Sequence, residues 1–138
     1  MEFKDSMATA LQRLDMKKGL KNFIYIGKMA AFYVPSKKLK KKEFGENGKT
    51  PKGMFHDFFM KHFNAYTHEK SGIEGFWRKE KGAIVIDENE RYEVSFLDNK
   101  DQLEKFISFL SKMCDLLKEN SIYVTIGDSS WLVKKEEL

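Results

Sequence analysis

The chain has 138 residues, of which 41% are hydrophobic, 14% aromatic and 33% charged. This size and aromatic content fit a single domain over residues 1–138 and exclude a disordered chain. The net charge of +4 is uneven, because residues 1–60 hold 13 Lys and Arg against 6 Asp and Glu, whereas residues 61–138 hold 12 against 15.

The first half of the chain alternates apolar and basic segments. Apolar residues at helical spacing over residues 3–16 predict a short N-terminal helical extension over residues 1–18. Residues 23–34 are apolar and aromatic, which is typical of a buried strand. Residues 36–50 are rich in Lys and Gly without apolar periodicity, so an exposed lysine-rich loop is expected. Thr50 and Pro51 then predict the N-cap and first residue of a helix.

The second half predicts strands, one long helix and a hairpin. Strand patterns cover residues 73–78, 83–86 and 91–97, and the last two are either one bulged strand or two. Residues 100–119 have a complete apolar stripe, and Asn99 with Gln102 resembles a capping box. A strand over 122–126 and a short one over 131–133 form a small C-terminal hairpin. The order predicts an α+β fold, a ferredoxin-like βαββαβ sandwich of four mostly antiparallel strands with two helices on one face.

Motifs for catalysis, metals and cofactors are lacking. His56, His62 and His68 recur at a spacing of six, which turns successive side chains to different sides of a helix and does not suit zinc. Cys114 lies on the apolar stripe of the long helix, where a thiol is inert. No nucleophile elbow or phosphate-binding loop is present. The sequence therefore predicts no catalytic residue, no metal and no cofactor, and it favours a protein that is not an enzyme.

The lysine-rich loop is the first candidate binding surface. Lysines neutralise phosphates without reading bases, and only three of the 25 basic residues are Arg, so binding to nucleic acid is expected to be independent of sequence. A solvated loop is the alternative without a function. The candidate residues for contact with nucleic acid or another macromolecular partner are Lys37, Lys38, Lys40, Lys41, Lys42, Lys49 and Lys52.

A small-molecule pocket is the second candidate site. Aromatic and charged residues occur together at the ends of the predicted strands, where they would line a ligand site. The residues are Tyr66, Trp77, Arg78 and Glu90. Core packing of Trp77 is the alternative.

Several short motifs resemble a group of small uncharacterised bacterial ferredoxin-like proteins. They are Phe63-Asn-Ala-Tyr-Thr after a helix, Gly75-Phe-Trp77 in a strand, Asp87-Glu88 before the next strand, and Ser121-Ile-Tyr-Val124 after the second helix. The resemblance covers residues 50–126, supports the predicted fold and implies no activity.

Three functions remain open at this stage. The favoured one is a non-enzymatic cytoplasmic adaptor or inhibitor that binds a protein or nucleoprotein through an exposed sheet face and the basic loop. The alternatives are sequence-independent binding of nucleic acid, and a small-molecule enzyme or sensor with a pocket near Trp77. No membrane contact is expected, because no apolar run reaches the length of a membrane span. A homodimer that covers the open sheet face is a further expectation.

Overall fold

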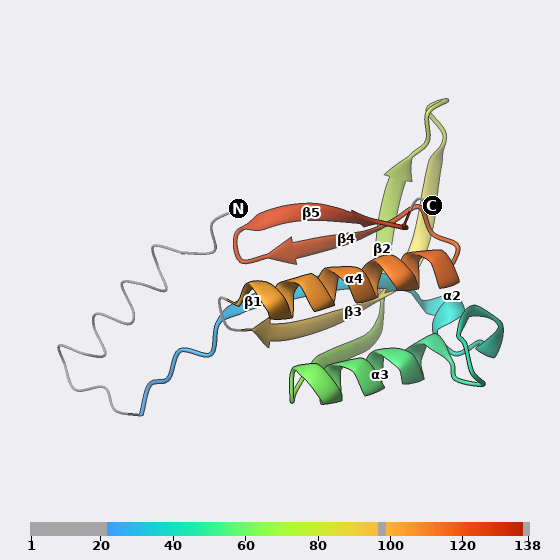
Figure 1. Cartoon of the computed structure of the whole chain (residues 1–138). Coiled ribbons are helices and arrows are strands. Elements are labelled where there is room, and N and C mark those ends of the chain that lie inside the picture. The colour runs from blue at the N-terminus through green and yellow to red at the C-terminus, as the bar shows by residue number, and fades with distance from the viewer. Residues whose placement is uncertain (1–21, 97–98, 137–138) are drawn as a thin grey trace.

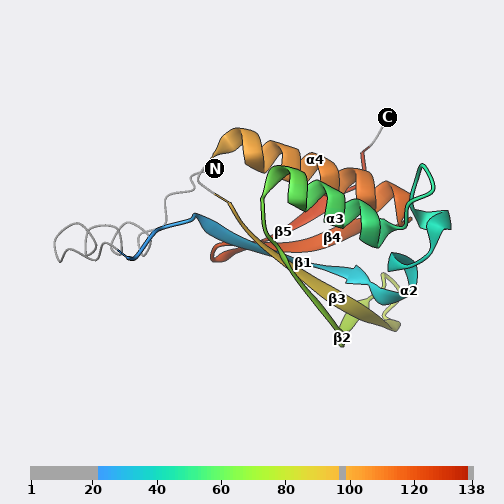
Figure 2. The same ribbon diagram turned by 90° about the horizontal axis from the view of Figure 1, so that it is seen from below.

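The computed structural model describes residues 22–96 and 99–136. Its elements follow the order β1 (Lys28–Pro35), α2 (Ser36–Leu39), the 3₁₀ turn η1 (Lys42–Phe44), α3 (Pro51–His62), β2 (Thr67–Arg78), β3 (Ile84–Phe96), α4 (Lys100–Leu116), β4 (Ser121–Ile126) and β5 (Ser129–Lys134). The strands form one antiparallel sheet in the order β2-β3-β1-β4-β5. Helices α3 and α4 lie side by side on one face of that sheet (Figures 1 and 2). The predicted α+β class is confirmed.

The first strand is shorter than the sequence suggested. The prediction began it at Phe23, but β1 begins at Lys28, where pairing with Phe96 of β3 starts. Phe23, Ile24 and Ile26 have exposed fractions of 49%, 77% and 63%. No strand of the described sheet pairs with residues 23–27, so apolarity alone did not fix the strand end. The predicted helix over residues 1–18 lies outside the described residues.

Two long strands replace the three short ones predicted between α3 and α4. β3 runs without interruption from Ile84 to Phe96, and β2 pairs with it along most of its length. The register of β2 shifts between Glu69 and Ile73. The sequence left open whether residues 83–86 and 91–97 form one strand or two, because Asp87, Glu88 and Glu90 look like part of a turn, and the structure shows one strand.

The segment predicted as an exposed loop over residues 36–50 is partly helical and anchored. α2 and η1 lie within it, and Leu39 is fully buried. Lys38 donates from Nζ to the carbonyl oxygen of Leu117 at 2.6 Å and pairs with the Glu119 carboxylate at 3.1 Å. Burial of one apolar residue and a lysine that reaches the end of α4 therefore fix a segment whose composition suggested only solvent exposure.

The two long helices begin where the sequence placed them. Thr50 caps α3, since its Oγ1 accepts a hydrogen bond from the Gly53 amide at 3.1 Å. Asn99 caps α4 in the same way through the amides of Asp101 and Gln102. The predicted capping box is wrong in one respect: the Gln102 side chain donates to the carbonyl oxygen of His62, at 3.1 Å, and so connects α4 to the end of α3.

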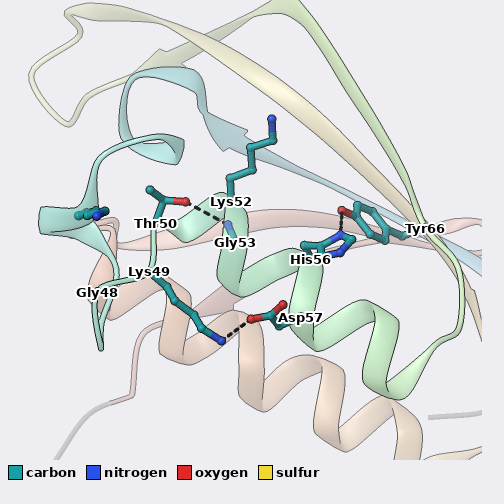
Figure 3. Close-up of a pocket in the computed structure, with 9 residues that line it drawn as sticks. Gly48, Lys49, Thr50, Lys52, Gly53, His56, Asp57 and Tyr66 are labelled. Carbon is teal, nitrogen blue, oxygen red and sulfur yellow. Dashed lines mark hydrogen bonds and ion pairs between the residues drawn. The ribbon is translucent and has the colours of Figure 1, made fainter.

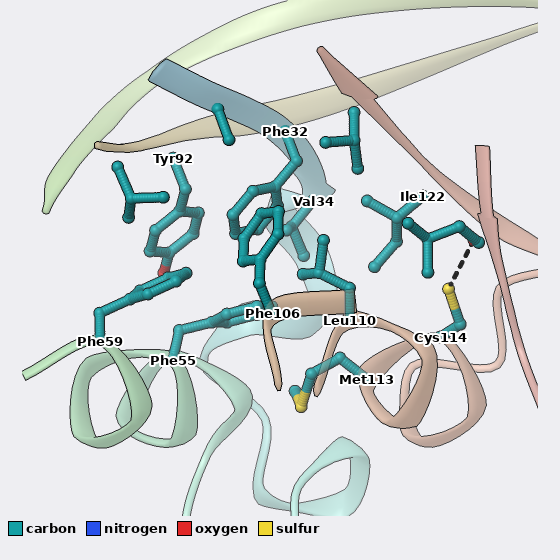
Figure 4. Packing of buried hydrophobic residues seen from close by; sticks show 14 of the residues in the cluster. Phe32, Val34, Phe55, Phe59, Tyr92, Phe106, Leu110, Met113, Cys114 and Ile122 are labelled. Atoms are coloured by element: carbon teal, nitrogen blue, oxygen red, sulfur yellow. Dashed lines mark hydrogen bonds between the residues drawn. The ribbon is translucent and has the colours of Figure 1, made fainter. Parts of the chain in front are cut away.

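The core lies between the helices and the sheet, with Phe32 of β1 at its centre (Figure 4). The Phe32 ring contacts four buried aromatic rings at centroid distances of 5.3–5.9 Å, those of Phe55, Phe59, Tyr92 and Phe106. Burial of such large rings is the main apolar contribution to the stability of this layer.

Cys114 packs at the other end of the same core. Its thiol contacts the carbonyl oxygen of Val133 at 3.3 Å, and burial raises its pKa to about 11. This inert thiol is what the sequence predicted for a cysteine on the apolar stripe. Among the residues that the structure describes, no helix is long and apolar enough to span a membrane.

Candidate small-molecule site

A pocket of about 550 Å³ lies where the basic segment enters α3. Its walls come from three consecutive parts of the chain: the end of the lysine-rich segment, the first two turns of α3, and the residue before β2 (Figure 3). The lining residues are Lys42, Gly48, Lys49, Thr50, Lys52, Gly53, His56, Asp57 and Tyr66.

A lysine–carboxylate pair forms one wall of the pocket. Lys49 donates to the carboxylate of Asp57, which lies in the second turn of α3. The hydrogen bond and the positive charge of Lys49 lower the pKa of Asp57, so the carboxylate is ionised at neutral pH. Both side chains are more than half exposed, so the pair contributes little to stability and both groups are accessible to a ligand.

A histidine–tyrosine pair also lines the pocket. His56 Nδ1 and the Tyr66 hydroxyl lie 2.7 Å apart, and the rings meet edge to face at a centroid distance of 5.7 Å. Burial raises the pKa of Tyr66, and the charge of Asp57 raises it further. The phenol therefore stays protonated at neutral pH and serves as a hydrogen-bond donor or acceptor rather than as a base.

Tyr66 also connects the pocket to the core. Its ring stacks on Tyr92 at 6.0 Å, and Tyr92 stacks on His68 at 4.2 Å. His68 Nε2 lies 2.8 Å from the Glu90 carboxylate, with both side chains 9% exposed. The stacked rings of Tyr66, Tyr92 and His68 therefore fix the position of Tyr66 in the pocket, although Tyr66 lies in the loop before β2.

The structure divides the seven candidate lysines into three groups. Lys42, Lys49 and Lys52 line the pocket. Lys38 is occupied by its contacts with the end of α4. The remaining three, Lys37, Lys40 and Lys41, are exposed. Their binding of nucleic acid stays a prediction.

The four residues of the predicted ligand pocket do not come together. Tyr66 lines the pocket. Trp77 and Arg78 lie at the far end of β2, where they pair with Val85 and Ile84. Glu90 is buried beside His68. Sequence reasoning weighed His56 only as a metal ligand and missed Asp57, because both are ordinary polar positions of the predicted helix.

The pocket combines groups that suit a small, polar, charged ligand. Asp57 offers a negative charge, Lys42 and Lys52 offer positive charges, and Tyr66 offers a ring face and a hydroxyl. An aromatic ring stacks on a base or attracts a cation. Together these groups match an organic molecule that carries both charges and a ring. Within the described part of the chain, no three His, Cys, Asp or Glu residues are grouped in a way that could hold a metal ion.

The fold is similar to that of a phage SAM lyase in complex with S-methyl-5′-thioadenosine, with a TM-score of 0.54. The identity is 14%, and the match covers 84% of this chain and 98% of the lyase chain. A phage SAM lyase in the apo state gives a TM-score of 0.52 at 14% identity, over 81% of this chain and 92% of that one. The sequence matches no family model and no curated protein. At this identity the similarity is one of fold.

These matches correct two expectations from the sequence. The resemblance to small uncharacterised bacterial ferredoxin-like proteins is wrong, because the solved structures that match are phage SAM lyases. The interpretation as a non-enzymatic adaptor or inhibitor is also wrong, because the proteins that share the fold over most of both chains are enzymes. The first error arose from short sequence motifs and the second from the lack of catalytic motifs, and neither signal reports on a fold shared at 14% identity.

Proposed function

We propose that this chain is an enzyme that cleaves S-adenosylmethionine to S-methyl-5′-thioadenosine. The observation that carries the proposal is the similarity of fold to phage SAM lyase over 84% of this chain and 98% of the lyase. A fold by itself does not determine chemistry. The pocket beside α3 adds a site of about 550 Å³, within the range of roughly 300–1,000 Å³ that is usual for small ligands.

The reaction breaks the bond between the sulfonium sulfur and Cγ of the methionyl part. The sulfur keeps the bonding electron pair and becomes the neutral thioether of S-methyl-5′-thioadenosine. Without water, Cγ receives electrons in one of two ways: from the carboxylate of the same molecule, which gives homoserine lactone, or from the Cβ–H bond, which gives vinylglycine. Only the second route needs a base.

The pocket supplies groups for binding and orientation. Tyr66 would stack on the adenine ring or face the sulfonium, and the ionised Asp57 would attract the ammonium group or the ribose hydroxyls. Lys42 and Lys52 would hold the carboxylate. Holding the reacting carboxylate and Cγ in line is sufficient for the lactone route, because an intramolecular reaction gains most from orientation. Among the residues that line the pocket, His56 would serve as the base for the elimination route.

The test is incubation of the full chain with S-adenosylmethionine, followed by mass spectrometry of the products. S-methyl-5′-thioadenosine is expected well above a blank without protein. Asp57→Asn and Tyr66→Leu are each expected to lower the rate by about tenfold or more, because the first loses the negative charge and the second loses the ring face that orients the substrate. Tyr123→Phe is the matched control, since Tyr123 bonds Ser130 on the β4–β5 hairpin and should leave the rate unchanged.

The two parts of the proposal fail separately. Absence of S-methyl-5′-thioadenosine at any protein concentration would overturn the activity. Full activity in both pocket variants would show that the active site lies outside this pocket, and the proposed activity itself would be retained. The second product distinguishes the routes: homoserine lactone excludes His56 as an essential base, whereas vinylglycine requires one.

We also propose that the domain, taken as residues 1–138, has the ferredoxin-like arrangement. Its support is the strand order β2-β3-β1-β4, the antiparallel pairing, and the position of α3 and α4 between β1 and β2 and between β3 and β4. β5 then extends the sheet beyond β4 as a hairpin.

A further inference from the structure

The far end of the β2–β3 hairpin is a two-stranded ribbon without cover from the rest of the described chain. β1 pairs with β3 only from Asn89 to Phe96, so residues 84–88 of β3 have β2 as their sole neighbour. Figure 1 shows this end of the hairpin projecting beyond the other strands and the helices. We call residues 73–78 and 84–88 the distal ribbon. A ribbon of two strands is only marginally stable alone in water.

The distal ribbon is apolar on both faces. Phe76 and Ile86 are a cross-strand pair on one face, and they are 63% and 61% exposed. Ile84, which lies two residues before Ile86 and therefore on the same face, is 59% exposed. Trp77, which pairs with Val85 on the other face, is 44% exposed. Large apolar groups clustered on a projecting element mark an interaction surface.

The charges of the distal ribbon are separated along its length. Glu74 lies directly opposite Glu88, and like charges in such a pair destabilise the ladder. Neither carboxylate has an ion pair among residues 22–96 and 99–136. The tip, by contrast, is basic on balance, with Arg78, Lys79 and Lys81 against Glu80. When two ribbons run in opposite directions, the acidic end of each one therefore lies beside the basic tip of the other.

We propose that two copies of this chain form a dimer by antiparallel pairing of their β2 edges, with the two-fold axis at Phe76. β2 is an edge strand in the described sheet and has an unpaired side. In this register Phe76 meets the partner's Phe76, Glu74 meets the partner's Arg78, and Gly75 meets the partner's Trp77. The two Glu–Arg pairs relieve the Glu74–Glu88 repulsion.

The size of the surface predicts a reversible dimer. Edge-to-edge pairing joins the two β2 backbones, the two Phe76 rings and the two Glu74–Arg78 pairs, and it leaves the Ile84 and Ile86 side chains of β3 outside the seam. Such a surface is smaller than the roughly 1,200 Å² at the lower end of specific interfaces. Dissociation constants in the micromolar range follow. This pairing goes beyond the proposed activity and does not depend on it.

The test is sedimentation velocity of the full chain over a range of protein concentrations. Wild-type protein is expected to pass from monomer to dimer, and Glu74→Arg and Arg78→Glu are each expected to weaken the dimer by roughly tenfold or more. The double variant E74R/R78E restores both pairs by symmetry and is expected to return close to the wild-type dissociation constant. Leu132→Lys is the matched control, because Leu132 is 53% exposed on β5 at the opposite edge of the sheet.

Several outcomes would overturn the proposal. A monomer at every concentration would overturn the dimer, as would a loss of association in Leu132→Lys alone. Failure of E74R/R78E to recover would overturn the register. Oxidation of the Phe76→Cys variant provides an independent readout: a disulfide-linked dimer is expected, because facing residues of an antiparallel pair lie within disulfide range. Leu132→Cys should remain without a crosslink, and the absence of a crosslink in Phe76→Cys would contradict the two-fold axis.

Discussion

Replacing Tyr92 by Phe is expected to stabilise the protein. Tyr92 is fully buried between Phe32 and His68, with ring distances of 5.3 and 4.2 Å. Its hydroxyl has no hydrogen-bond partner among the described residues. A buried, unsatisfied polar group costs about 1–3 kcal/mol, because its hydrogen bonds with water are lost and not replaced. Phe keeps the ring and removes the hydroxyl.

The expected increase in the free energy of unfolding is about 1–2 kcal/mol, smaller than the full penalty because removal of one oxygen leaves a small gap. For a chain of this size, each kcal/mol corresponds to about 4 °C in Tm. Urea unfolding and thermal melts of Tyr92→Phe and wild type measure both values. Tyr123→Phe serves as the control, since Tyr123 is 36% exposed and its hydroxyl bonds Ser130 at 3.0 Å.

The same substitution is also expected to change how the free energy of unfolding depends on pH above pH 10. Burial raises the pKa of Tyr92 well above its ordinary value of 10.0, with smaller contributions from Tyr66 and Glu90. Above pH 10 the unfolded chain loses the Tyr92 proton while the folded chain keeps it, so wild-type stability falls by up to about 1.4 kcal/mol per pH unit. Tyr92→Phe lacks this loss. Destabilisation of Tyr92→Phe by more than about 1 kcal/mol at pH 7 would refute the reasoning, because it would mean that the hydroxyl is bonded.

Two further predictions concern α3 and α4. Thr50→Ala should lower the free energy of unfolding by about 0.5–2 kcal/mol, because the Gly53 amide loses its cap. Thr50→Ser keeps the hydroxyl and should cost less than half as much in urea unfolding, and equal losses would show that the cap is not the cause. Cys114 should resist a thiol reagent in the native protein at pH 8 and react on unfolding, because burial raises its pKa to about 11. Rapid labelling of the native protein would contradict its burial.

The sequence predicted elements well where a local pattern coincides with burial. The apolar stripe of α4 and the caps at Thr50 and Asn99 are local signals, and each appears at the predicted place. The length of β3 could not be predicted from the residues within it. Three of the residues 87–90 are acidic, yet all four belong to a strand because β2 pairs with residues 87–89 and β1 with residues 89 and 90. Strand limits depend on such partners, which lie far away in the chain.

The candidate site was harder to predict because residues of these types, at such positions, are usually solvated and have no function. His56 and Asp57 are polar positions on the exposed side of α3, and nothing in their spacing separates them from solvated helix residues. Tyr66 was selected for its aromatic ring, but its neighbours in the prediction, Trp77 and Arg78, lie at the other end of β2. A strand carries residues close in sequence to opposite ends of the molecule, so short sequence distance misled the grouping.

The pocket brings together three of the basic residues in the first half of the chain. Six carboxylates and thirteen basic residues occur before residue 61, and the two charge signs meet at the start of α3, where Asp57 pairs with Lys49 beside Lys42 and Lys52. A ligand with a carboxylate and a cationic centre finds both complements within this one wall. The mixed charge of the pocket therefore complements a zwitterionic small molecule.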